Sequence, residues 1–227
     1  NLRTHAYNGQ LAGKVKVALV STAKYVMPYF LKDFIDEHQQ IKLNIDVTNK
    51  ASVIRSLESN QVDFGLVSVI PDNLNINRVE LLENKLYLVG GKDSPQPSRS
   101  IAKKKIATLP MLYREKGSAT RMNMEKFIAD NNLPDTKRLE LTSNEAIKQA
   151  VIAGLGYSIM PLIGLKNELE NGDVKIVPVS NLPIITNWNL IWLKSKKLSL
   201  TSTAFVDHLK NKKQTIITER FEWYDKY

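Results

Sequence analysis

The sequence predicts an α/β protein with two lobes joined by a two-strand hinge. Three observations support this prediction. The 227 residues are long for one hydrophobic core and suit two compact lobes. Short apolar strands alternate with amphipathic helices along the chain. The alternation completes one βαβαβ unit, pauses at the Pro/Ser-rich stretch "KDSPQPSRS", and then begins a second unit of the same order.

The elements of the first unit follow from their apolar spacing. The segment "AKYVMPYFLKDFIDEH" carries apolar side chains at helical intervals, whereas "VKVALV" and "VDFGLVS" are short apolar runs typical of buried strands. Short strands separated by helices indicate a parallel sheet that the helices cover. In order, we expect a strand at 15–20, a helix at 23–38, a strand at 42–48, a helix at 51–60 and a strand at 62–68.

The second unit repeats this order after a strand at 86–91. Thr142 and Glu145 have the spacing of a capping box, which predicts the start of a helix. Gly154 supplies the left-handed residue that ends such a helix. In order, we expect a strand within 105–115, a helix at 118–132, a strand at 138–142, a helix at 143–154 and a strand at 157–161.

The last part of the chain is expected to return to the first lobe. Beyond the two units remain the strands "VKIVPVS" and "WNLIWLKS" and the helix "TSTAFVDHLKNKK". The later strand and the helix can complete the first lobe, if the chain crosses from the first lobe to the second near Gly90 and back again near Asn187. The prediction is therefore two Rossmann-like lobes, with residues 14–90 plus 188–227 in lobe I and 91–187 in lobe II.

Composition narrows the classes of function. The chain has no cysteine, which excludes disulfides, cysteine metal sites and thiolate catalysis. Its three histidines lack metal-ligand spacing, and no nucleophile motif is present, so we expect no enzyme, metal or cofactor. The start "NLRTHAYNGQLAGKVKV" lacks the apolar stretch of a signal peptide, and no uncharged run can span a bilayer. We expect a soluble, cytoplasmic protein whose net charge of +9 comes from scattered surface lysines.

Small polar residues follow nearly every predicted strand. In open α/β sheets, ligands bind beyond the carboxyl ends of the strands, where helices begin. Hydroxyls and amides at such positions either cap helices or bind a small polar molecule, and both interpretations remain open. The residues concerned are Ser21, Thr22, Thr48, Asn49, Ser68, Arg114, Gly117, Ser118, Thr120, Thr142, Ser143 and Asn144.

Four segments together resemble the effector-binding domain of LysR-type transcriptional regulators. They are "LAGKVKVALVSTAKYVMPYFLKDFIDEH", "VDFGLVS", "YREKGSATR" and "LTSNEAIKQAVIAGLGYSIMP", in the order and spacing of the family. The first and third look closest to the branch that controls carbon-fixation operons. The resemblance covers residues 11–213. It implies a fold like that of type 2 periplasmic solute-binding proteins, a small-molecule effector in the cleft between the lobes, and a transcriptional output.

The resemblance also implies which residues bind the effector, which we expect to be an anion. At two positions the chain departs from the related branch, because Lys116 stands where a proline is usual and Ala119 where a glycine is usual. This leaves the identity of the effector open. The implied effector-binding residues are Ser21, Thr22, Ser68, Arg114, Ser118, Thr142 and Ser143.

The resemblance further predicts the partners of the chain. We expect an antiparallel homodimer in which the helix at 26–38 of one chain packs against the helix at 121–131 of its mate. Such a contact would cover apolar side chains left partly exposed on these helices. DNA is expected to bind only through an N-terminal helix-turn-helix, of whose linker helix residues 1–13 resemble the end. No membrane partner is expected. The apolar side chains proposed for the contact are Met27, Phe30, Phe34, Met124 and Ile128.

Two other classes of protein share this architecture. A solute receptor of a transporter binds ligands by closing its two lobes, and it would carry a signal peptide or a lipobox cysteine in its full gene. An enzyme resembling prephenate dehydratase would need its own Thr-Arg motif in a catalytic loop, for which "ATR" is too short. A helix-turn-helix upstream would exclude the receptor, and turnover of candidate acids would be required for the enzyme.

Overall fold

The computed structural model describes residues 11–95 and 103–227. The interpretation of residues 1–13 as the end of a linker helix falls mostly on 1–10, which lie outside the described residues. Gly13 already begins the first strand, β1. Within the described ranges, no helix is both long and apolar enough to cross a membrane.

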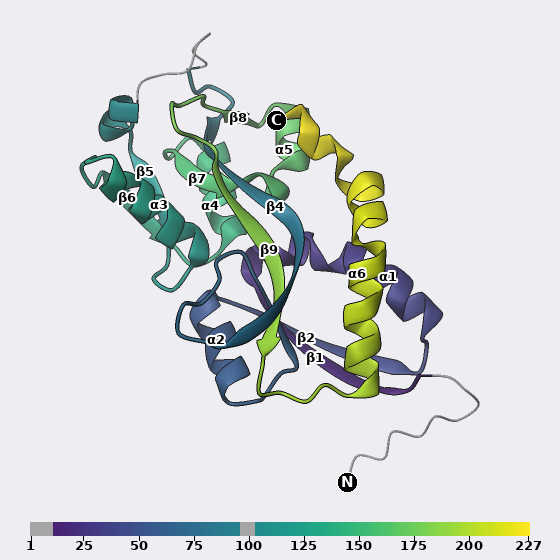
Figure 1. Cartoon of the computed structure of the whole chain (residues 1–227). Coiled ribbons are helices and arrows are strands. Elements are labelled where there is room, and N and C mark those ends of the chain that lie inside the picture. Colours follow the sequence, from purple (N-terminus) through teal and green to yellow (C-terminus); the bar gives the residue numbers. More distant parts are fainter. Residues whose placement is uncertain (1–10, 96–102) are drawn as a thin grey trace. The chain divides into compact units, whose positions relative to one another are not determined.

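The chain forms two compact units, which we call unit 1 and unit 2. Unit 1 comprises Asn1–Glu83 and Asn187–Tyr227, and unit 2 comprises Asn84–Thr186. The chain enters unit 2 within the long strand β4 (Ile76–Gly91) and leaves it within β9 (Ile184–Leu193). These two strands are neighbours in the sheet and each contributes residues to both units (Figure 1).

Unit 1 is built on a mostly parallel sheet in the order β2-β1-β3-β9. The central strand β1 pairs in parallel with β2 and with β3, as the βαβαβ pattern predicts. The returning strand β9 then pairs antiparallel with β3, which leaves β2 at the edge. The strands are β1 (Gly13–Val20), β2 (Ile41–Thr48) and β3 (Phe64–Val67).

The first predicted helix of unit 1 divides into two. A short 3-10 helix follows β1, and the α-helix α1 begins only at Met27. Pro28 accounts for this start, because proline lacks an N–H donor and fits the first helical turn. The helical elements of unit 1 are η1 (Ser21–Tyr25), α1 (Met27–Glu37), α2 (Lys50–Glu58), α6 (Leu200–Phe221) and η4 (Glu222–Lys226).

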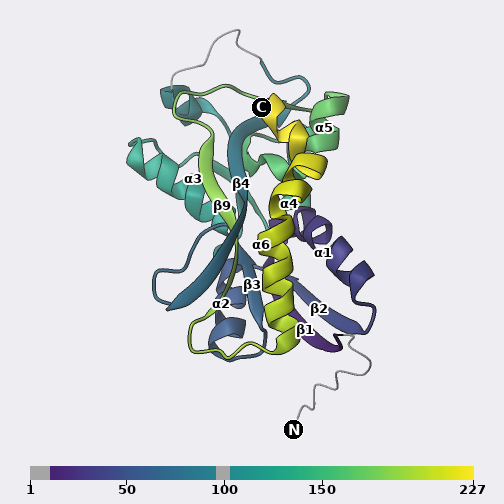
Figure 2. The ribbon, with the colours of Figure 1, turned by 45° about the vertical axis from the view of Figure 1, so that its right-hand side comes forward.

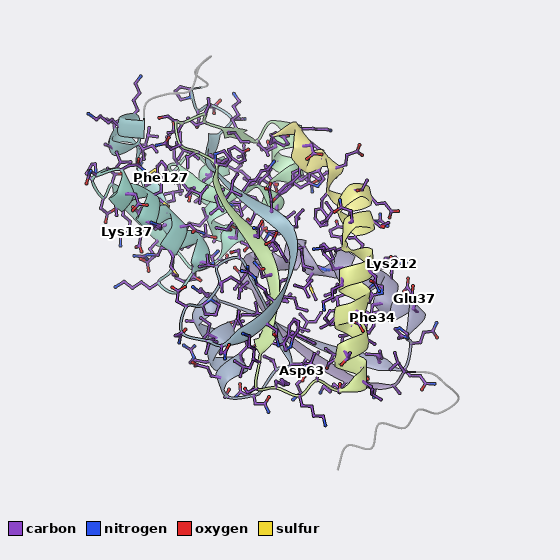
Figure 3. The ribbon with its side chains drawn as sticks, in the orientation of Figure 1. Phe34, Glu37, Asp63, Phe127, Lys137 and Lys212 are labelled. Atoms are coloured by element: carbon purple, nitrogen blue, oxygen red, sulfur yellow. The ribbon has the colours of Figure 1, made fainter. Side chains whose placement is uncertain are left out.

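The long helix α6 covers the apolar side of α1, beside which it lies in both views (Figures 1 and 2). Its C-terminal end extends beyond the predicted helix, and Phe221 stacks on Phe30 with ring centroids 6.0 Å apart. Phe34, which is labelled in Figure 3, packs against Phe205 of α6 with ring centroids 5.2 Å apart. The prediction that Met27, Phe30 or Phe34 is partly exposed is therefore wrong, because all three are fully buried, with Phe30 and Phe34 packed against aromatic rings of α6.

Unit 2 contains two groups of strands. β5 pairs in parallel with β6, as predicted, whereas β7 and β8 pair antiparallel with β4. A parallel bridge between Met111 and Tyr157 joins β5 to the start of β7. The strands are β5 (Met111–Arg114), β6 (Lys137–Leu141), β7 (Ser158–Pro161) and β8 (Val174–Ile176).

Two helices of unit 2, α3 (Ala119–Asp130) and α4 (Asn144–Ile152), bury apolar side chains in its core. Met124 and Ile128 of α3 are 1% and 8% exposed and belong to this core, so the prediction that they are partly exposed is also wrong. The helical elements are η2 (Lys103–Thr108), α3 (Ala119–Asp130), α4 (Asn144–Ile152), η3 (Leu162–Gly164) and α5 (Lys166–Asn171).

Candidate functional site

The N-terminus of α3 is held by a glycine turn and a serine cap. Gly117 adopts φ +90°, a left-handed conformation that glycine takes without steric cost. The buried Ser118 is the N-cap, and its Oγ accepts a hydrogen bond from the Arg121 amide at 3.4 Å. Lys116 is exposed and Ala119 is buried. Ser118 therefore caps the helix, and its predicted contact with an effector stays a prediction.

The N-terminus of α4 begins one residue later than the capping-box spacing predicts. Ser143 is the N-cap, because its Oγ accepts from the Ala146 amide at 3.0 Å and its carbonyl accepts from the Ile147 amide at 3.1 Å. Thr142 is exposed and precedes the cap. The capping box of Thr142 and Glu145 is thus wrong, since the Glu145 carboxylate pairs with Lys148 at 3.1 Å.

Arg114 ends β5 with its guanidinium already paired. Its Nε lies 2.7 Å from Oε2 of Glu115 and its Nη2 lies 2.9 Å from Oε1, and the Arg114 side chain is 4% exposed. Such a two-point pair is a strong, geometrically specific contact. The Glu115 carboxylate offsets the positive charge of the Arg114 guanidinium. An anionic ligand would therefore compete with Glu115 for the guanidinium.

Arg121 is a positioning residue that sequence reasoning missed. Its buried guanidinium donates to the Arg114 carbonyl at 2.9 Å, to Glu140 at 2.7 Å and to Glu125 at 2.6 Å. The hydrogen bond from Arg121 holds the pKa of the Glu140 carboxyl below its ordinary value. These contacts fix the start of α3 against β5 and β6. The spacing of Arg121 and Glu125, four residues apart, was the signal available in the sequence.

In unit 2, the predicted site residues gather at one edge of a parallel strand pair. The register pairs Arg114 of β5 with Leu141 of β6, so the two strands end side by side. The connections to α3 and α4 therefore leave the same edge, and this edge is where ligands bind in open α/β sheets. The structure brings together the four residues predicted in unit 2, which are Arg114, Ser118, Thr142 and Ser143.

Unit 1 has an equivalent edge. β1 and β3 are parallel neighbours with Leu19 opposite Leu66, so Ser21 and Ser68 follow the two strands at matching positions. Thr22 and Ser68 are 5% and 6% exposed. The structure therefore brings the three residues predicted in unit 1, Ser21, Thr22 and Ser68, to one edge of the sheet.

Two α/β units with polar strand ends are typical of the type 2 periplasmic-binding fold, as predicted. Residues 8–214 match the family model described as "LysR substrate binding domain". The chain is therefore a member of this family. This confirms the resemblance to LysR-type regulators.

Individual relatives agree with the carbon-fixation branch. The chain is 34% identical to the HTH-type transcriptional activator CmpR of Synechocystis over 88% of this chain and 66% of the relative. It is 33% identical to a RuBisCO operon transcriptional regulator of Allochromatium vinosum over 87% of this chain and 66% of the relative. The chain thus spans just under two thirds of these relatives, which are transcriptional regulators and not transporter receptors.

A solved structure supports the same assignment. The regulatory domain of Synechocystis CcmR, in complex with 2-PG, superimposes with a TM-score of 0.83 at 31% identity, over 88% of this chain and 96% of that chain. The effector-binding domain of QuiR, in complex with shikimate, has a TM-score of 0.79 at 19% identity and shows the common fold.

Proposed function

We propose that this chain senses a small anionic metabolite for a LysR-type transcriptional regulator. The observation that carries the proposal is the gathering of polar strand ends at one sheet edge within each unit. The complex of the related CcmR domain with 2-PG supports an acidic ligand. DNA recognition would belong to a helix-turn-helix of the kind named in the relatives, and the described units would bind rather than catalyse.

Helix N-termini give this site its preference for anions. The first amides of a helix have no partner within the helix, and its dipole places partial positive charge at that end. The N-termini of α3 and α4 both start at the edge of unit 2 that carries the predicted residues. A ligand can shift the conformation of the regulator only through different affinities for its states. The proposed contacts are Ser21, Thr22, Ser68, Arg114, Ser118, Thr142 and Ser143.

Calorimetry with metabolic acids and sugar phosphates, including 2-PG, tests this function. Thr142→Val should weaken binding by about 1 kcal/mol for the lost hydrogen bond, and it should leave stability unchanged because Thr142 is exposed and is not the cap. Ser118→Ala should weaken binding to a similar extent and also lower stability, because Ser118 caps α3.

Ser199→Ala is the matched control. Ser199 caps α6 in unit 1 through a 3.1 Å hydrogen bond from the Ser202 amide, so its loss should lower stability and leave affinity unchanged. If Thr142→Val and Ser118→Ala both bind the ligand as tightly as the wild type, the hydroxyls are not part of the site.

We also propose a homodimer, with contact residues that differ from those expected from sequence. The exposed apolar side chains on α1 are Tyr29 and Ile35, and Met122 is exposed on α3. The edge strand β2 exposes Ile45 and Val47 by 40% and 47%, and the outer backbone edge of β2 pairs with no other strand of the described residues. A soluble protein normally covers or charges such an edge, and a second copy would cover this one.

Sedimentation of an Ile45→Glu/Val47→Glu variant tests the dimer. Both side chains are exposed, so the change should leave the fold of unit 1 intact while opposing like charges across a dimer contact. We expect the wild type to sediment as a dimer at micromolar concentration and the variant as a monomer. Leu200→Glu, at an apolar residue 69% exposed at the start of α6, should remain dimeric. A monomeric wild type would contradict the proposal.

A further inference from the structure

Asn144 is a buried polar residue whose side chain has no hydrogen-bond partner in the described part of the chain. It is the first residue of α4 and is 1% exposed. Neither its Nδ2 nor its Oδ1 has a hydrogen-bond partner among the described residues. Burying an unpaired amide costs free energy, and an apolar side chain of the same size would avoid that cost. The stability of unit 2 therefore does not explain an asparagine at this position.

Two other buried asparagines, Asn84 and Asn189, each make a side-chain hydrogen bond. Asn84 donates through Nδ2 to Oγ1 of Thr186 at 3.1 Å, and Asn189 donates through Nδ2 to the Asn187 carbonyl at 2.7 Å. In each of these, only Oδ1 is without a partner among the described residues. Asn144 differs because both ends of its carboxamide are unpaired.

Asn144 lies at the first position of α4, and the N-terminus of this helix is part of the candidate site. In an α-helix the Cα–Cβ bonds tilt toward the N-terminus, so a side chain at the first position leans over the helix start. The neighbouring polar groups are already engaged, since Ser143 caps the helix and Glu145 pairs with Lys148. The carboxamide of Asn144 thus brings unused hydrogen-bonding capacity to the helix end that favours anions.

The two ends of a carboxamide require opposite partners. Nδ2 donates, so an oxygen of a carboxylate or phosphate can satisfy it, but Oδ1 accepts and needs an O–H or N–H donor. An ionised acid group alone leaves Oδ1 unpaired. We propose that Asn144 binds the effector directly and selects an acid that also carries a hydroxyl group. This inference rests on the proposed function, because it assigns one more residue and a ligand class to the same site.

Paired acids that differ by one hydroxyl test the inference. Calorimetry on the chain compares malate with succinate, and phosphoglycerate with its deoxy analogue. The wild type should bind the hydroxy acid of at least one pair about tenfold more tightly than its partner, because the deoxy acid leaves Oδ1 buried and unpaired. Asn144→Leu should bind that hydroxy acid at least about tenfold more weakly, lose the discrimination, and melt no lower than the wild type.

Asn123→Leu is the matched control. The Nδ2 of Asn123 also lacks a partner among the described residues, but the residue lies inside α3, away from the helix start. This variant should keep both the affinity and the preference for the hydroxy acid.

The possible failures are distinguishable. If the wild type binds acids and Asn144→Leu keeps the same affinity and preference, the inference is wrong and the proposed function stands. A wild type that binds acids without preferring the hydroxyl overturns the selection by Asn144. If Asn144→Leu melts at a markedly lower temperature and still prefers the hydroxy acid, Asn144 has a structural role and the inference is wrong. If the wild type binds none of these acids or the wider panel, the proposed function itself fails.

Discussion

Replacing Gly156 with alanine should destabilise unit 2 by about 3 kcal/mol or more, because the added methyl has no space. A Cβ at this position would overlap the Pro110 carbonyl oxygen and lie 3.1 Å from a methyl carbon of Leu112. The Pro110 carbonyl accepts a hydrogen bond from the Tyr157 amide at 2.9 Å, and this bond joins the start of β7 to β5. The backbone would have to move, and urea unfolding measures the loss.

Gly154→Ala is the control for this prediction. Gly154 has φ +75°, and no atom lies within 4 Å of the place that a Cβ would take, so alanine there meets only backbone strain of about 1–2 kcal/mol. The unfolding midpoint should therefore fall further for Gly156→Ala than for Gly154→Ala. The reverse order would show that the contact between β5 and β7 adjusts easily.

Lys148→Met should lower the free energy of unfolding by about 2 kcal/mol, because it leaves a half-buried carboxylate without its cation. The Lys148 side chain is 8% exposed, and its Nζ lies 2.7 Å from Glu168 of α5 and 3.1 Å from Glu145. Methionine keeps most of the side-chain volume but removes the charge, together with the 3.4 Å hydrogen bond from Nζ to the Gly164 carbonyl. Lys126→Met is the control, since Lys126 and Asp130 form an exposed pair, which contributes little.

The effect of Lys148 should disappear at alkaline pH. Burial acts to lower the pKa of Lys148, but hydrogen bonds and charges from Glu168 and Glu145 outweigh it and raise the pKa above the ordinary 10.5. A raised pKa means that the stabilisation is complete below pH 10.5 and is lost as the pH rises through the folded-state value. Above that pH, the free energies of unfolding of the wild type and of Lys148→Met should converge. A difference that persists unchanged would contradict the ion-pair explanation.

Local patterns in the sequence predicted most of the elements, because each element carries its own apolar period and end signals. The strand "VKVALV" and the glycine stop at Gly154 are examples, and both lie where the pattern placed them. The start of α4 was missed by one residue, since Thr142 and Ser143 are both good capping residues. Which of them caps depends on the backbone conformation that β6 imposes, and sequence spacing does not contain that information.

The exposed faces could not be predicted from the helices alone. The helix α1 is apolar on more than one side, with Phe30 and Phe34 buried but Tyr29 and Ile35 partly exposed. The helix α6 determines which face of α1 is buried, because its Phe221 packs on α1. Since α6 lies near the C-terminal end of the sequence, the local pattern of α1 does not contain this information. The same limit applies to Asn144, because its burial and unpaired amide arise from packing that no local pattern records.

Unit 2 is one continuous stretch of chain, whereas unit 1 is made of two stretches. The first and last residues of unit 2, Asn84 and Thr186, are joined by a 3.1 Å hydrogen bond between their side chains. Unit 2 is therefore an insert whose two junctions lie on neighbouring strands, the arrangement in which domain insertions are tolerated. Two in-frame crossovers, one at each junction, can therefore exchange unit 2 between related genes, which would replace the ligand contacts proposed in unit 2 and keep those proposed in unit 1.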